Sequence, residues 1–337
     1  MRGTVLGAWA LLVATAAGQT CNGYSELCGR AFNQVAYVTT HNSYATGDNI
    51  AANQNKSIRQ QLDAGVRGFM LDLHKLSSGS SSEPYLCHTS CTLLNGGKLV
   101  DALRDFKTYL DRNGGEVVTI YIENAEPFGA AGMAQPFRDA GLDKYAYVPA
   151  QGAGGGAWPT LGEMVGSGKR LVVFADRGAD AAVAPWILAE DAYSVQTSYS
   201  VGAGSAFDCQ PLKAVRPLWV MNHFVYTNYT VFGVAFERPS PGTAATVNAE
   251  SSIEDQAALC QSAGHMPSFV TVDYYDVGGV FRAAAAINKV AYKSTATTTF
   301  GSSKESASKT QSAAGPLPVP ALGPALAALA ALALALA

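Results

Sequence analysis

Short runs of β-branched and aromatic residues alternate with stretches of helical spacing along most of this chain of 337 residues. Such runs, bounded by turn residues, predict about eight strands: Gln34–Thr40, Val66–Leu73, Tyr85–Cys87, Val117–Ile122, Arg170–Ala175, Ser194–Tyr199, Leu218–Asn222 and Phe269–Tyr274. Helical spacing predicts helices at Ile50–Ala64, Leu99–Arg112, Ala131–Ala140, Val247–Ala263 and Val280–Val290. Strands that alternate with helices form parallel sheets, so the pattern predicts an α/β fold, a (β/α)8 barrel. An open doubly wound sheet is the alternative.

Polar side chains with chemical capability gather where the predicted strands end. They are His41 and Asn42 after the first strand, Asp72 and His74 at the second, His88 at the third, Glu123 at the fourth, Asp176 and Arg177 at the fifth, Asn222 and His223 at the seventh, and Asp273 at the eighth. Barrel enzymes carry their chemistry at the carboxyl ends of the strands. The excess of His, Asp and Glu there predicts an active site at that end.

Two histidines and a set of oxygen ligands suit the cleavage of a phosphodiester. Attack by a neighbouring hydroxyl needs a base, an acid for the departing oxygen, and positive charge against the phosphorus. His41 and His88 can supply the base and the acid near neutral pH. Asn42, Asp72 and Glu123 offer oxygen ligands for a hard cation such as Ca²⁺. Each histidine taken alone has a simpler reading as a hydrogen-bonded loop residue, and only the joint pattern favours a site.

The two ends of the chain predict export and a lipid anchor. Residues 1–18 combine a basic start, a short apolar run and a small-residue exit, which is typical of a signal peptide. Residues 19–292 hold the predicted barrel, and residues 293–312 form a Ser/Thr-rich stalk. Residues 313–337 run from small residues through a Gly/Pro spacer to an Ala/Leu tail, the order of a glycosylphosphatidylinositol (GPI) anchor signal. A membrane span and an uncleaved secreted tail are the alternatives.

Cysteine number and charge agree with an extracellular site of action. Six cysteines in an exported chain predict disulfides, with a zinc site as the alternative. Closeness in sequence suggests Cys21–Cys28, Cys87–Cys91 and Cys209–Cys260 among the about 15 pairings that six cysteines allow. The Asn-x-Ser/Thr sequons at Asn55 and Asn228 predict glycans on surface loops. A net charge of -3 argues against nucleic acid as a partner.

Four ordered motifs resemble the catalytic X region of phosphatidylinositol-specific phospholipases C (PI-PLC). They are Thr40-His41-Asn42-Ser43-Tyr44, Gly65-Val66-Arg67-Gly68-Phe69-Met70-Leu71-Asp72, Leu86-Cys87-His88 and Val118-Thr119-Ile120-Tyr121-Ile122-Glu123-Asn124. The later segments Met221-Asn222-His223-Phe224 and Val272-Asp273-Tyr274-Tyr275 are similar to those of the secreted, often lipid-anchored PLC-like phosphodiesterases of fungi and plants. The resemblance covers residues 33–288, nearly the whole predicted domain.

The resemblance implies roles for individual residues. His41 would assist the attacking inositol hydroxyl, His88 would protonate the diacylglycerol oxygen, and Asp273 would orient His41. Asn42, Asp72 and Glu123 match three of four calcium ligands in calcium-dependent members. The fourth position is Met70, where those enzymes have glutamate, so the resemblance implies a weakened calcium site. Metal-free bacterial members instead have a basic residue at the position of Asp72.

Three functions remain open at this stage. The first is a surface phosphodiesterase of the phospholipase C type, which would act on a phospholipid or glycolipid. The second is an enzyme like glycerophosphodiesterase or sphingomyelinase D, although those relatives have a Glu-x-Asp pair where this chain has Met70-Leu71-Asp72. The third is a binding protein that keeps the barrel without turnover; Met70 favours it, and the retention of both histidines argues against it.

Overall fold

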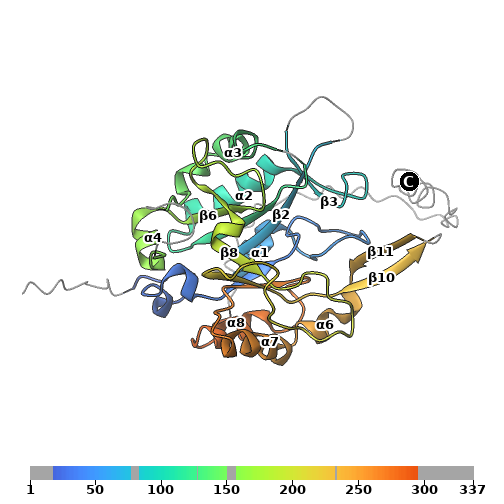
Figure 1. Cartoon of the computed structure of the whole chain (residues 1–337). Coiled ribbons are helices and arrows are strands. Elements are labelled where there is room, and N and C mark those ends of the chain that lie inside the picture. The colour runs from blue at the N-terminus through green and yellow to red at the C-terminus, as the bar shows by residue number, and fades with distance from the viewer. Residues whose placement is uncertain (1–17, 77–82, 127, 150–156, 232–233, 295–337) are drawn as a thin grey trace, which may run out of the picture.

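Eight parallel strands form a curled sheet that helices cover from outside (Figure 1). The computed structural model describes residues 18–76, 83–126, 128–149, 157–231 and 234–294. The strands follow one another around the sheet in chain order: β1 Tyr37–Thr40, β2 Gly68–His74, β5 Val118–Glu123, β6 Leu171–Ala175, β7 Ile187–Ala189, β8 Ser194–Gln196, β9 Leu218–Asn222 and β12 Phe269–Val272. The last strand, β12, pairs with the first, β1. This order confirms the predicted α/β barrel and excludes a doubly wound sheet, whose strand order reverses.

The barrel is open between β7 and β8, which do not pair within the described residues. Only the short helix α5, Glu190–Tyr193, separates the two strands. Parallel neighbours need a crossover of about a dozen residues or more, so this connection is too short to let β7 and β8 pair. Strand β7 was not predicted, because a run of three residues is too short for its alternation to be recognised.

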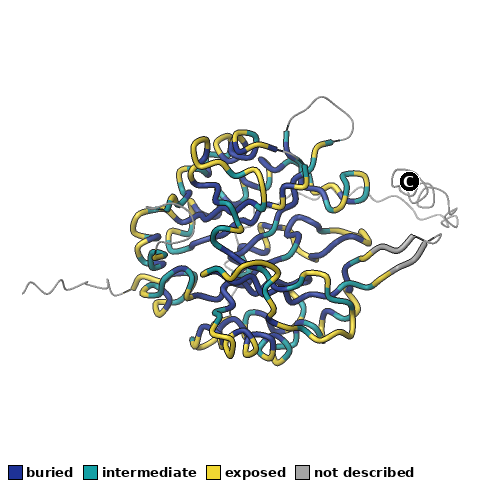
Figure 2. Tube along the Cα trace, in the orientation of Figure 1, coloured by how far each residue is buried: buried dark blue, intermediate teal, exposed yellow. Residues whose placement is uncertain are grey.

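Strand alternation divides the core into two parts. The apolar residues at alternate strand positions, including Tyr37, Tyr121 and Phe269, pack inside the barrel in one cluster. Residues between them, such as Val38 and Ile120, pack outward against the helices in a larger cluster. Successive strand side chains point to opposite faces, so one sequence pattern fills both layers. The strands are accordingly buried along most of their length, and the exposed residues lie on the outer surface (Figure 2).

Helices α2 and α3 cover one side of the sheet and α7 and α8 the other (Figure 1). The helices are α1 Ile58–Ala64, α2 Leu99–Arg112, α3 Ala130–Asp139, α4 Leu161–Ser167, α6 Ala244–Val247, α7 Glu250–Ser262 and α8 Val280–Ile287. The predicted helix at Ile50–Ala64 is wrong in its first half. Ser57 accepts a hydrogen bond from the backbone N–H of Gln60 and completes a capping box, so α1 begins only at Ile58.

Two further strand pairs lie outside the barrel. Strand β3, Tyr85–His88, runs antiparallel to β2 and to β4, Leu94–Lys98. The prediction of β3 as a barrel strand is therefore wrong, and β5 takes its place beside β2. The sequence analysis also missed the antiparallel hairpin of β10, Tyr226–Val231, and β11, Val234–Pro239, which projects from the body (Figure 1).

The three predicted disulfides, Cys21–Cys28, Cys87–Cys91 and Cys209–Cys260, are all present. They use all six cysteines, which rules out the zinc alternative. The predicted signal peptide, except Gly18, and the predicted anchor tail lie outside the described residues. So does the stalk beyond Ser294. Among the helices that are described, none has the length and apolar character needed to cross a bilayer.

Candidate active site

The candidate site lies at the carboxyl end of the barrel. The alternation of inward-facing and outward-facing side chains continues just past the ends of β1 and β12. Thr39 on β1 is in register with Thr271 on β12, and both are buried in the interior layer. The residues two positions further along are His41 and Asp273. They therefore emerge side by side on the inner face, directly above this layer. Asp72 on β2 and Glu123 on β5 are in register in the same way.

His41 is held from two sides. Its Nδ1 lies 2.9 Å from Asp273 Oδ1. A carboxylate only accepts hydrogen bonds, so Nδ1 carries the proton and Nε2 faces the mouth. The ring stacks on Phe224 with centroids 4.1 Å apart. Burial lowers the pKa of His41, but the charge and hydrogen bond of Asp273 act against it, and the net pKa is raised.

His88 is held by a backbone group. Its Nδ1 donates to the carbonyl oxygen of Ala51 at 2.7 Å, which again leaves Nε2 free. Burial lowers the pKa of His88, and the nearby charge of His41 lowers it further. The turn after His88 is fixed by the Cys87–Cys91 disulfide, and Thr89 within it has a left-handed backbone (φ 61°). Such a conformation is costly for a β-branched residue and is found where a site constrains the chain.

The carboxamide of Asn42 lies between the imidazoles and Asp72. One of its terminal atoms is 3.2 Å from His41 Nε2 and 3.3 Å from His88 Nε2, and the other is 3.0 Å from Asp72 Oδ1. If the Asn42 nitrogen faces the imidazoles, it also donates to Asn53 Oδ1 at 3.2 Å. If the amide is turned over, its nitrogen donates to Asp72 instead. The orientation is an assignment. We favour the first because both Nδ1 atoms are donors, so the Nε2 lone pairs face Asn42.

Asp72 and Glu123 form an acidic pair beside Asn42. Burial raises the pKa of Asp72 well above its ordinary value, and the charge of Glu123 raises it further. Tyr44 donates its hydroxyl hydrogen to Asp72 Oδ2 at 2.9 Å. No cluster of three or more His, Cys, Asp and Glu side chains in the described ranges could hold a metal ion. The candidate set instead combines two carboxylates with the amide oxygen of Asn42, and Met70 adds no oxygen.

The other predicted rim residues have structural partners. His74 faces Glu126 at 3.8 Å. Asp176 accepts from the backbone N–H of Asn124 and pairs with Arg177. His223 is fully buried, with Nδ1 2.7 Å from Gln256 Oε1 and Nε2 2.8 Å from the carbonyl oxygen of Val247. Asn222 donates to the carbonyl oxygen of Thr197. These contacts give each of them a role in the framework of the barrel.

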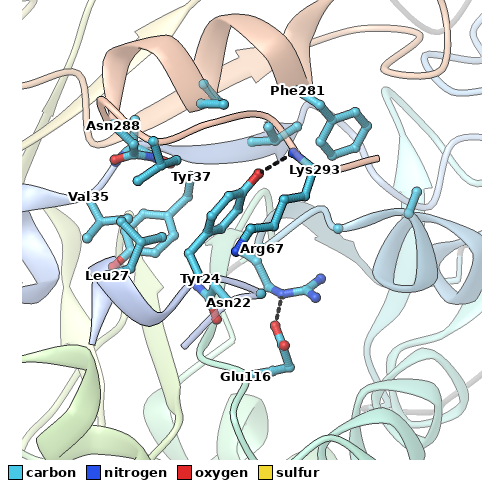
Figure 3. Close-up of a pocket in the computed structure, with 18 of the residues that line it drawn as sticks. Asn22, Tyr24, Leu27, Val35, Tyr37, Arg67, Glu116, Phe281, Asn288 and Lys293 are labelled. Atoms are coloured by element: carbon cyan, nitrogen blue, oxygen red, sulfur yellow. Dashed lines mark hydrogen bonds and ion pairs between the residues drawn. The ribbon is translucent and has the colours of Figure 1, made fainter. Parts of the chain in front are cut away.

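A cavity of about 360 Å³ lies at the opposite end of the barrel (Figure 3). It is lined by Tyr24, by Tyr37 at the start of β1, and by the buried ion pair of Arg67 with Glu116 (2.7 Å). Lys293 lies beside Tyr24, and its backbone N–H donates to the Tyr24 hydroxyl. None of the candidate site residues lines this cavity. Its size is therefore no guide to the chemistry.

The sequence pattern of the PI-PLC X family (PI-PLC X 1) matches residues 27–288. The chain belongs to the PI-PLC X family. Residues 27–288 contain both histidines, Asp273 and the candidate ligands. The predicted resemblance is confirmed over nearly the same residues.

Relatives of this PI-PLC X chain occur in fungi and plants. It is 33% identical over 285 residues to PI-PLC X domain-containing protein 1 of Arthroderma benhamiae, covering 81% of this chain and 91% of the relative. It is 32% identical over 290 residues to an "Uncharacterized secreted protein" of the same fungus, covering 81% of this chain and 64% of the relative. It is 28% identical over 296 residues to PI-PLC X domain-containing protein At5g67130 of Arabidopsis thaliana, covering 80% of this chain and 66% of the relative.

Solved structures share the fold of this PI-PLC X domain. The phosphatidylinositol-specific phospholipase C of Listeria monocytogenes superposes with a TM-score of 0.52 at 15% sequence identity. The match covers 80% of this chain and 97% of that one. At this identity the likeness concerns the fold, which is a barrel of the same kind.

Sequence reasoning missed several residues of the PI-PLC X site. Asn53 and the carbonyl group of Ala51 lie in the segment that was predicted as helix. Phe224 lies in a quoted motif without an assigned role, and Tyr226, whose hydroxyl is 3.5 Å from His41 Nε2, opens the missed hairpin. Only the motif around Phe224 gave a signal. The others contact the histidines across long stretches of sequence, which no local pattern records.

Proposed function

We propose that the chain is a surface phosphodiesterase of the phospholipase C type that cleaves a phosphatidylinositol-like or glycerophosphodiester lipid by two-histidine acid–base catalysis. One observation carries the proposal: the free Nε2 atoms of His41 and His88 converge on the same side-chain atom of Asn42. Two imidazoles that face one point can act on one phosphorus from its attacking and leaving sides. A barrel kept only for binding has no need of this convergence.

His41 is the proposed base. Its Nε2 takes the proton of the substrate hydroxyl as that oxygen forms a bond to phosphorus. The raised pKa of His41 makes it the stronger base of the two. Asp273 keeps the other nitrogen protonated and stabilises the imidazolium that forms.

His88 is the proposed acid. For this step His88 starts as the imidazolium, protonated on both ring nitrogens. The bond between phosphorus and the departing oxygen breaks, and His88 gives that oxygen the proton of its Nε2. The products are a cyclic phosphodiester and an alcohol, so atoms and charge balance without a further reactant. The lowered pKa of His88 lets it release the proton readily. The Ala51 carbonyl keeps Nε2, and not Nδ1, directed at the substrate.

A calcium ion fits the acidic pair, and we propose Asn42, Asp72 and Glu123 as its ligands. The fit rests on two adjacent carboxylates, one of them buried, next to an amide oxygen, a donor set that suits a hard cation. When bound, the ion would supply positive charge against the phosphate oxygens. Met70 would contribute no carboxylate, so water or substrate oxygens would have to complete the coordination, and the affinity would be low.

We propose that the chain is exported and held at the cell surface by a lipid anchor. The three disulfides support an oxidising compartment. A relative whose name describes it as secreted supports export as well. The anchor itself rests on the sequence of residues 313–337. The proposed partners are thus a lipid substrate and a membrane surface.

The decisive experiment compares turnover in single and double histidine variants of residues 19–292. The substrates are phosphatidylinositol, lysophosphatidylinositol and sphingomyelin, with and without Ca²⁺, and the products are identified. His41→Ala and His88→Ala should each lose about 10²–10⁴-fold in rate with little change in thermal melt. The double variant should lose far less than the product of the two, because both groups serve one transition state.

Each contrary outcome names another function. Full activity in His88→Ala with an unchanged melt would end the two-histidine mechanism. Release of a free headgroup alcohol from lysophosphatidylinositol or sphingomyelin would favour the glycerophosphodiesterase or sphingomyelinase D type. No turnover of any of them, with retained lipid binding, would favour a binding protein.

A further inference from the structure

A four-residue segment between β1 and α1 contacts the supports of both histidines. It consists of Ala51, Ala52, Asn53 and Gln54, and all four are buried. We propose that Asn53 is a positioning residue: its side-chain amide holds the Asp273 carboxylate in the orientation that aligns His41. The inference rests on the function proposed above, since it concerns the base of that reaction.

The hydrogen bonds of Asp273 are the main observation. Within the described part of the chain, its carboxylate has two partners, both on Oδ1: His41 Nδ1 at 2.9 Å and Asn53 Nδ2 at 3.0 Å. Oδ2 is buried and has no hydrogen-bond partner. Among the described residues, Asn53 is thus the only hydrogen-bond partner of the carboxylate besides His41, and its Nδ2 also lies 3.2 Å from His41 Nδ1. Without it, Asp273 could turn about its side-chain bond together with the imidazole.

Asn53 is itself fixed on every side. Its side chain is fully buried. Its backbone N–H donates to the carbonyl oxygen of Ala45 at 2.9 Å, and its carbonyl oxygen accepts from the N–H of Tyr274 at 2.8 Å. Its Nδ2 faces Asp273 because a carboxylate oxygen can only accept a hydrogen bond. A donor held this firmly is suited to orienting a neighbour.

The same segment also reaches the second histidine. The Ala51 carbonyl accepts from His88 Nδ1, and Gln54 Nε2 donates to the carbonyl oxygen of His41 at 2.8 Å. One short segment thereby relates the positions of the proposed base and acid. A change at Asn53 should therefore affect their alignment more than the stability of the barrel.

The test compares Asn53→Ala with Asn288→Ala. Asn288 is a matched control: it is almost fully buried, and its amide bonds both backbone groups of Ala36 near the start of β1, far from the site. Both variants should lower the melting temperature by similar amounts. Asn53→Ala should lower kcat by about 10–100-fold with KM nearly unchanged, the usual effect of losing such a support. Asn288→Ala should keep the kcat of wild type per folded molecule.

A double variant separates positioning from general damage. In an Asp273→Asn background, adding Asn53→Ala should cost little further rate, because Asn53 acts through the Asp273 carboxylate. Equal kcat in Asn53→Ala and Asn288→Ala would overturn the inference. So would a full multiplicative loss in the double variant. If Asn53→Ala does not fold, Asn53→Ser, which fills more of the space, takes its place.

A spectroscopic readout does not depend on turnover. In ¹⁵N-labelled wild-type protein, the His41 Nδ1–H should give a resonance protected from exchange with water. This resonance should broaden or vanish in Asn53→Ala and persist in Asn288→Ala. Persistence in both variants would overturn the positioning role even if the protein proves not to hydrolyse phosphodiesters. Loss in Asn53→Ala alone, without any turnover, would uphold the role and contradict only the proposed function.

Discussion

The two histidines of the site are tuned in opposite directions by what surrounds them. Burial disfavours the charged form of both; at His41 the Asp273 carboxylate outweighs this effect, whereas at His88 the nearby charge of His41 adds to it. Their pKa values therefore move apart from a common starting value. Pairs of titratable groups that are separated in this way are typical of acid–base sites.

Asp273→Asn tests this tuning at His41. Without the carboxylate the pKa of His41 should fall, so the acidic limb of the kcat/KM profile should move to lower pH. The pKa of His41 is higher in the folded protein than in the unfolded chain. The His41–Asp273 pair therefore stabilises the fold fully at pH values below the unfolded pKa, and this contribution is lost as the pH rises through the folded pKa. The variant should therefore lose more stability near pH 5.5 than near pH 9. An unshifted acidic limb would show that Asp273 does not set the pKa of His41.

The acidic pair gives a prediction about Ca²⁺. The pKa of Asp72 is higher in the folded protein than in the unfolded chain. The fold therefore loses stability as the pH rises above the pKa that Asp72 has in the unfolded chain. In the absence of divalent cations, Asp72→Asn should therefore melt at a higher temperature than wild type at pH 7. Added Ca²⁺ should raise the melting temperature of wild type, not that of Asp72→Asn; an excess of 100 times Kd gives about 2.7 kcal/mol. Met70→Glu should tighten the response, and an equal response in all three would refute the proposed ligands.

At the scale of elements, the turn after β3 brings a residue from outside the barrel to its mouth. His88 ends an antiparallel strand, and its position depends on the pairing of β3 with β2 and on the Cys87–Cys91 bridge. The bridge closes only a short loop, four residues apart in sequence, whereas Cys209–Cys260 spans 51. The stabilisation from a disulfide grows with the length of the loop it closes, so the Cys209–Cys260 bridge should contribute more to the stability of the fold than the Cys87–Cys91 bridge.

Removing each bridge should separate activity from stability. Because each bridge restricts the unfolded chain, the Cys87–Cys91 bridge should stabilise the fold by roughly 2 kcal/mol and the Cys209–Cys260 bridge by about 4 kcal/mol. Cys87→Ser with Cys91→Ser should lower kcat strongly and the melt modestly, because the His88 turn loosens. Cys209→Ser with Cys260→Ser should lower the melt more and leave kcat per folded molecule near that of wild type. The reverse ranking in kcat would mean that the short bridge does not position His88.

At the scale of the whole molecule, the candidate site and the end of the described chain lie at opposite ends of the barrel. The histidines lie at the carboxyl ends of the strands. The last described residues, including Lys293, lie against the cavity at the opposite end (Figure 3). The last described residues therefore lie on the face away from the candidate site.

Truncation tests the anchor proposal. A chain ending after Gln311 lacks the proposed anchor signal and should be released into the medium, while the full chain should remain on the cell surface. The two should have the same melting temperature, since the barrel is complete in both. A truncated form that stays cell-bound like the full chain would rule out the anchor.

The sequence by itself determined the barrel class and the family. It suggested the three disulfide pairs that the structure contains, and it proposed the candidate site residues, whose roles stay predictions. These follow from local patterns: alternation that recurs every two residues, ordered motifs, and cysteines close in sequence. The tertiary structure alone decided that His88 comes from outside the barrel, that β7 completes the sheet, and that Asn53 supports Asp273. Asn53 and Asp273 are 220 residues apart in sequence, and their contact forms only when the first and last barrel strands pair. Contacts of this range depend on how the whole sheet curls and brings its first and last strands together, so no local pattern carries them.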